Sequence, residues 1–141
     1  MSIREWFRGQ AREEERVRAL GEYDASSYPE ELAEILRKRE EVAAELLGLR
    51  LTEREARAAA IPRLHELLRR YPHPLAYEAL IHAYLDAERF DEARGVAFAA
   101  RERRAECERS PYPEIRMEVE GLRAWTPEEV DELREEREAR R

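Results

Sequence analysis

The sequence predicts an all-α protein, a compact helical stack in which one pair of helices forms an antiparallel hairpin. Apolar residues make up 43% and charged residues 42% of the chain, enough apolar content for a core beneath a densely ionic surface. Glu, Arg, Ala and Leu dominate, and these side chains lose little freedom in a helix. Apolar positions also recur at spacings of three and four residues along most of the chain.

The length of 141 residues suits one domain with a single core. We expect this helical domain to span residues 22–133. An amphipathic helix over residues 1–21 precedes it, and a charged tail over residues 134–141 follows it.

The first predicted helix carries an apolar stripe that ends before Gly21, a residue typical of helix ends. The stripe consists of Ile3, Trp6, Phe7, Ala11, Val17 and Leu20. Such a stripe can lie on a membrane surface, but the acidic run 13–15 would meet anionic lipid unfavourably. We therefore expect Trp6 and Phe7 to pack on the rest of the protein or on a partner.

Prolines mark the boundaries of the next helices. Pro29 suits a helix start, with Tyr28 as the expected cap, and the helix that follows ends at Gly48. A third helix is expected from Thr52, which has capping-box spacing to Glu55, to about residue 71. Since proline cannot donate a hydrogen bond within a helix, Pro62 predicts a kink or break near Ile61.

Two helices are then expected on either side of a short turn at residues 88–89. The first follows the rigid turn Pro72–His73–Pro74, and the second begins at Asp91. Two helices joined by so short a link pack against each other in antiparallel orientation.

The last part of the chain contains one ambiguous segment and one clear helix start. Residues 113–122 fit both strand alternation and helical spacing, and we expect a helix because a lone strand would have no partner. Thr126, Pro127 and Glu129 predict the start of a final helix, with Trp125 and Val130 forming a hydrophobic staple. Residues 134–141 are expected to form a solvated helical tail.

Residues 74–105 resemble a tetratricopeptide repeat. The residues that stand at matching spacings are Tyr77, Leu80, Tyr84, Phe90, Ala93 and Ala100. The segment departs from the family pattern at Ile81, where glycine is usual, and at Ala105, where the closing proline is absent. Ala97 also stands where a larger residue is usual, with Phe98 beside it.

The resemblance implies a site for a protein partner, because the first helix of such a repeat lines a surface that receives a peptide. The exposed row would consist of Leu75, Glu78, His82, Leu85 and Asp86. The alternative is that Leu75 and Leu85 face a neighbouring helix and that the other three face water.

Several classes of function lack a sequence signal. His65, His73, His82 and Cys107 do not have the paired spacing of metal ligands, and no glycine-rich phosphate loop is present, so we expect no metal, cofactor or catalytic residues. The formal charge of −7 disfavours nucleic acid. No apolar run approaches about 18 residues, so no membrane span is expected. The lone cysteine favours the cytoplasm.

The expected function is therefore a non-enzymatic adaptor or accessory subunit of a larger assembly. It would bind another protein or a peptide through the hairpin row or through Trp6 and Phe7. Two alternatives stay open: a small helical enzyme with His65 or His82 beside a carboxylate, and a structural homo-oligomer.

Overall fold

The structure is a computed structural model, and it describes residues 28–123 and 125–141. Within these ranges it is all-α with no strand, which confirms the predicted fold class. The elements are α2 (Glu30–Leu47), α3 (Arg54–Ala59), α4 (Ile61–Arg70), α5 (Pro74–Asp86), α6 (Phe90–Glu108), α7 (Pro113–Arg116), the 3-10 helix η2 (Met117–Arg123) and α8 (Pro127–Ala139). Trp6, Phe7 and the helix expected over residues 1–21 lie outside the described residues.

The prolines set the helix boundaries largely as predicted. The expected break near Ile61 is present, because α3 ends at Ala59 and α4 begins at Ile61 with Pro62 in its first turn. The predicted caps are wrong in detail. Pro29, with extended backbone, occupies the N-cap of α2 in place of Tyr28, and α3 begins after Glu53 without a side-chain cap from Thr52.

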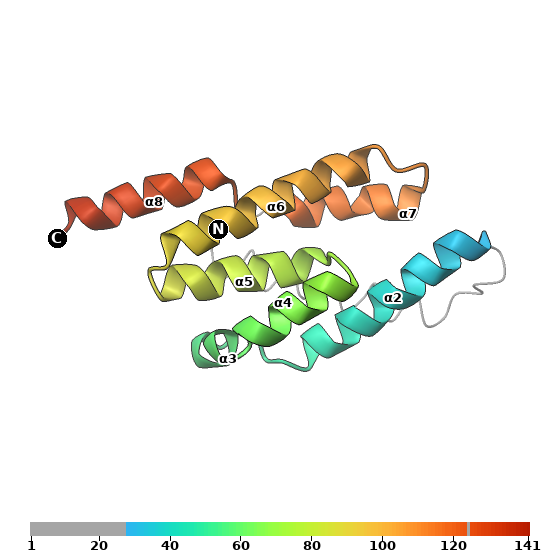
Figure 1. The fold of residues 1–141 in the computed structure, drawn as a ribbon, viewed down its shortest axis with the longest axis horizontal. Coiled ribbons are helices and arrows are strands. Elements are labelled where there is room, and N and C mark those ends of the chain that lie inside the picture. The colour runs from blue at the N-terminus through green and yellow to red at the C-terminus, as the bar shows by residue number, and fades with distance from the viewer. Residues whose placement is uncertain (1–27, 124) are drawn as a thin grey trace.

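Helix α5 is the central element of the fold. It packs against α3, α4, α6 and η2, and its sequence is apolar on nearly every side, as a helix enclosed by others requires. After the turn at residues 87–89 the chain reverses into α6, which lies antiparallel beside α5 (Figure 1). The predicted pairing of these two helices is therefore confirmed.

The α5–α6 pair has small residues at its contact. Ala93, Ala97 and Ala100 of α6 are buried, which lets the two helix axes lie close together. At the other end of α5, His73 is fully buried, and its Nδ1 accepts a hydrogen bond from the backbone N–H of Leu75 at 3.0 Å. This imidazole caps the helix that begins at Pro74.

Residues 113–123 are helical, as expected, but only the first turn is α-helix. The chain then tightens into η2, in which Leu122 is buried while Met117 is 60% exposed. Gly121 explains part of this geometry, since a Cβ at this position would lie 2.8 Å from the Cβ of Pro74. The close approach of η2 to the start of α5 therefore requires glycine.

Helix α8 begins as predicted and continues through most of the expected tail. The Thr126 hydroxyl accepts a hydrogen bond from the Glu129 N–H at 3.1 Å. Arg134 pairs with Asp91 at 2.9 Å, and Arg137 donates to the Leu85 carbonyl at 3.0 Å. The tail is thus helical up to Ala139 and is held against the α5–α6 turn.

The core consists of two groups of apolar side chains. The larger group surrounds α5, and the smaller one joins α2, α6, α7 and η2 through residues such as Leu36, Cys107 and Ile115. Between α2 and η2 lies an ion pair of Arg39 with Glu118, whose side chains are each 1% exposed. Their burial makes this pair a specific link between distant parts of the chain.

Candidate functional site

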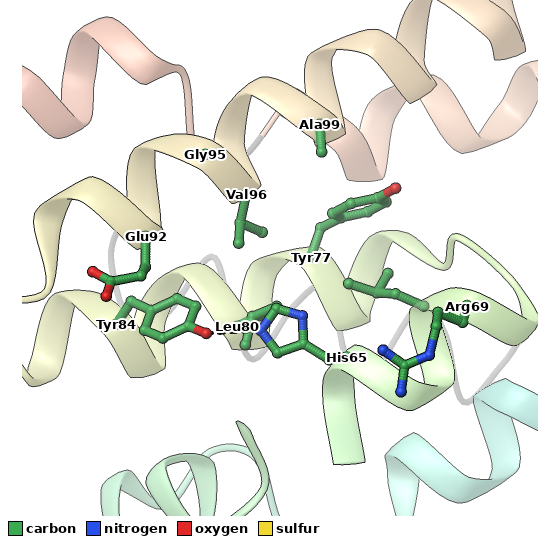
Figure 2. A pocket seen from close by; sticks show the side chains of 10 residues that line it. His65, Arg69, Tyr77, Leu80, Tyr84, Glu92, Gly95, Val96 and Ala99 are labelled. Atoms are coloured by element: carbon green, nitrogen blue, oxygen red, sulfur yellow. Dashed lines mark hydrogen bonds between the residues drawn. The ribbon is translucent and has the colours of Figure 1, made fainter. Parts of the chain in front are cut away.

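A groove runs between α4 and α6, with α5 as its floor (Figure 2). Both α4 and α6 pack on α5 but make few direct contacts with each other, so the space between them is open. We call it the α4–α6 groove. Its volume is about 410 Å³, and its lining residues are His65, Leu68 and Arg69 of α4, Tyr77, Leu80 and Tyr84 of α5, and Glu92, Gly95, Val96 and Ala99 of α6. Binding sites commonly have such a volume and a mainly apolar lining.

The floor and the α6 wall of the groove are apolar. Leu80 is fully buried at the bottom, and Val96 and Ala99 are partly buried along the wall. Gly95 stands on the same wall, and among the described residues no atom outside the adjoining α6 backbone lies within 4 Å of where its Cβ would be. These residues therefore leave room beside Gly95, where an occupant can come close to the backbone of α6.

The α4 side of the groove carries a hydrogen-bonded ring pair. His65 Nε2 lies 2.7 Å from the Tyr84 hydroxyl, and the two ring centroids are 6.0 Å apart. The Arg89 guanidinium lies 4.9 Å from the centroid of the Tyr84 ring, where a cation is attracted by the aromatic face. These contacts hold Tyr84 in one orientation, so this part of the groove is preformed.

The charged residues of the groove lie at its rim. Glu92 forms an ion pair with Arg89 at 3.1 Å, so its charge is matched within the protein. The Arg69 side chain is exposed and forms no hydrogen bond or ion pair with a described residue. Nearby, burial raises the pKa of Tyr77, which keeps its hydroxyl protonated at neutral pH. The groove thus offers an apolar floor, tyrosine hydroxyls and one arginine whose charge is not matched by a described residue.

The chain matches no protein-family model, no curated protein and no solved structure.

The row of residues expected to bind a partner is not an exposed row. Leu75 and Leu85 are 5% and 4% exposed and belong to the core, so the prediction of exposure is wrong for these two. The alternative, in which both leucines face neighbouring helices, describes them correctly. The reason is the central position of α5, which the tetratricopeptide resemblance would place at a surface.

The polar members of the same row are partly buried. Asp86 forms an ion pair with Arg57 of α3 at 2.9 Å. The His82 ring lies edge-on to Trp125, with 6.2 Å between the centroids. Burial, with a further contribution from Arg57, lowers the pKa of His82 to about 4. His82 is therefore neutral at physiological pH, and neither it nor Glu78 lines the α4–α6 groove.

Three groove residues were already noted in the sequence for another reason. Tyr77, Leu80 and Tyr84 stand at positions that match the tetratricopeptide pattern, and in the structure they line the groove. The residue in the sequence that could have indicated the groove is Gly95. A glycine inside a long helix is unfavourable unless its missing side chain serves packing or binding, and close packing against the described residues does not explain this one.

The described residues lack two other features. Residues 28–123 and 125–141 contain no group of three or more His, Cys, Asp or Glu side chains placed to hold a metal ion. In the same ranges, no helix has the length and apolar character needed to cross a membrane.

Proposed function

We propose that this protein is a non-enzymatic interaction module, an adaptor or accessory subunit, which binds a segment of another protein in the α4–α6 groove. The observation that carries the proposal is the open space beside Gly95, above an apolar floor and next to a ring pair that is already fixed. Preformed apolar grooves favour binding because little side-chain freedom is lost when the occupant enters.

The proposal moves the partner site away from the row expected from the sequence. It retains the tetratricopeptide-like character of the α5–α6 hairpin, but the partner would lie on the side of α5 that faces α4 and α6. We also propose a cytoplasmic location, because the buried free thiol of Cys107 suits a reducing compartment.

A helical peptide library displayed on phage tests the proposal. Peptides are selected on the full chain in the presence of excess Gly95→Leu protein as competitor. The leucine side chain would extend from a Cβ position that has no other side chain of the described residues within 4 Å, and it would occupy space that the peptide needs. Glu102→Leu is the matched control, since it adds the same side chain to an exposed position of α6 outside the groove lining.

The proposal expects peptides that bind the original protein and the Glu102→Leu control equally. On the Gly95→Leu protein these peptides should lose at least about tenfold in affinity, which corresponds to about 1.4 kcal/mol. Circular dichroism checks that both variants are folded. If repeated selection yields only peptides that bind the folded Gly95→Leu protein equally well, the groove is not a binding site.

A further inference from the structure

The rim charge and shape of the α4–α6 groove indicate what kind of partner it fits. We propose that the occupant is an acidic amphipathic helix of a partner protein, with apolar side chains on the groove floor and a carboxylate beside Arg69. This inference rests on the proposed function of the same groove and specifies the chemistry of its ligand.

Helix α4 carries three arginines, which differ in their ion pairs. Arg63 forms an ion pair with Glu66 at 2.8 Å, and Arg70 forms one with Glu45 at 2.6 Å. Arg69, between them in sequence, is exposed at the groove and has no such partner among the described residues. At the other end of the groove Arg89 matches Glu92 at 3.1 Å. The charge left for an occupant is therefore positive, and it favours a carboxylate over an ammonium group.

The length of the groove suits two turns of helix. Along α5 the lining extends from Tyr77 to Tyr84, which is roughly 10 Å at the helical rise of about 1.5 Å per residue. A partner helix presents side chains three, four and seven residues apart on one face over the same length. Gly95 lets that helix approach the α6 wall closely.

The hydrogen-bonding needs of a peptide backbone also favour a helical occupant over an extended one. An extended segment needs partners for its N–H and C=O groups, but the groove is walled by helices whose own backbone groups are bonded internally. His65 and Tyr84 already bond each other at 2.7 Å. The backbone groups of a helix are hydrogen-bonded within the helix itself. A helical occupant therefore needs only apolar contacts and the charge of Arg69 from the groove.

Two synthetic peptides test the inference by isothermal titration calorimetry. Each is an alanine-rich helix of roughly 16 residues, long enough to populate helix in water, with leucines four residues apart. They differ only in whether the position next to the leucines holds Glu or Lys. We expect the full chain at low salt to bind the Glu peptide about fivefold more tightly than the Lys peptide. Added salt should reduce this preference.

Charge reversal at the rim provides the decisive comparison. Arg69→Glu should invert the preference, so that the Lys peptide binds more tightly. Arg109→Glu is the matched control, because Arg109 is also exposed and lies outside the groove lining. This substitution changes the net charge by the same amount as Arg69→Glu. This control should keep the preference for the Glu peptide.

The outcomes separate this inference from the proposed function. If the two peptides bind with equal affinity and both lose binding to Gly95→Leu, the groove is a binding site but its partner is not specifically acidic. Affinities that Gly95→Leu does not change would overturn the groove itself. A rise in peptide affinity of about tenfold in the Trp6→Ala/Phe7→Ala variant would assign the groove to the chain's own N-terminal segment and overturn an external partner.

Discussion

At the scale of single residues, the ion pair of Arg39 with Glu118 has the largest predicted effect on stability. The Arg39 Nε donates a hydrogen bond to a Glu118 carboxylate oxygen, and both side chains are 1% exposed. Removing either member breaks a charged hydrogen bond in a buried setting, where water cannot replace it.

We therefore expect Arg39→Met and Glu118→Gln each to lower the free energy of unfolding by about 1.5 to 3 kcal/mol, because each change removes a buried hydrogen bond between charged groups. Urea denaturation measures both. Arg37→Gln serves as the exposed control, since Arg37 pairs with Glu34 at 2.6 Å on the surface and should matter little. Two single variants as stable as this control would show that the buried pair is unimportant.

His82 makes stability depend on pH in a definite direction. Its pKa in the folded protein is about 4, below the usual value of 6.5, mainly because of burial. The folded state therefore resists protonation of this ring. The resulting stability is fully present above pH 6.5 and is lost as the pH falls from 6.5 towards 4.

His82→Gln should remove this contribution. When the pH is lowered from 7.5 to 4.5, the free energy of unfolding should fall in both proteins. We expect the fall to be smaller in the variant, by on the order of 2 kcal/mol. The measurement is urea denaturation at both pH values, and the comparison cancels the titration of groups that the two proteins share. Identical pH dependence in the two proteins would show that His82 titrates alike in the folded and unfolded states.

At the scale of helices, the glycines at positions 95 and 121 have different effects on packing. Among the described residues, a Cβ at Gly95 would have no contact within 4 Å outside the adjoining α6 backbone, whereas a Cβ at Gly121 would lie 2.8 Å from the Cβ of Pro74. Glycine is unfavourable inside a helix such as α6 because it gains conformational freedom on unfolding. At Gly121 the same residue is needed for η2 to approach the start of α5.

Substitution by alanine should therefore have opposite effects at these positions. Gly95→Ala should stabilise the protein by about 0.5 to 1 kcal/mol. Gly121→Ala should destabilise it by on the order of 1 to 3 kcal/mol, because η2 must move away from Pro74. Thermal unfolding of the two variants side by side makes the comparison. A loss of stability in Gly95→Ala would mean that the space beside α6 is already filled.

Most helix boundaries could be predicted because they depend on local chemistry. Pro62 produces the break between α3 and α4, and Thr126 caps α8 through its own side chain. The change from α-helix to 3-10 helix at Met117 could not be predicted in this way. It depends on the contact of Gly121 with Pro74, two residues far apart in sequence.

At the scale of the whole molecule, the central position of α5 explains why the site could be predicted only in part from the sequence. Helical periodicity located this helix but not its surroundings, and the resemblance to a repeat suggested an exposed row that includes Leu75 and Leu85. The near absence of a polar face on α5 was the sign that helices surround it. The α4–α6 groove arises from the spacing of three helices, which no local pattern encodes.

The proposed function depends on a partner helix in the α4–α6 groove. A titration of the full, methyl-labelled chain with the acidic leucine peptide, followed by NMR, tests this binding directly. We expect the largest shift changes at Leu68, Leu80 and Val96, which line the groove, and little change at Met117, which is 60% exposed and lies outside the groove lining. Saturable shifts centred on Met117, with the groove methyl groups unchanged, would contradict it.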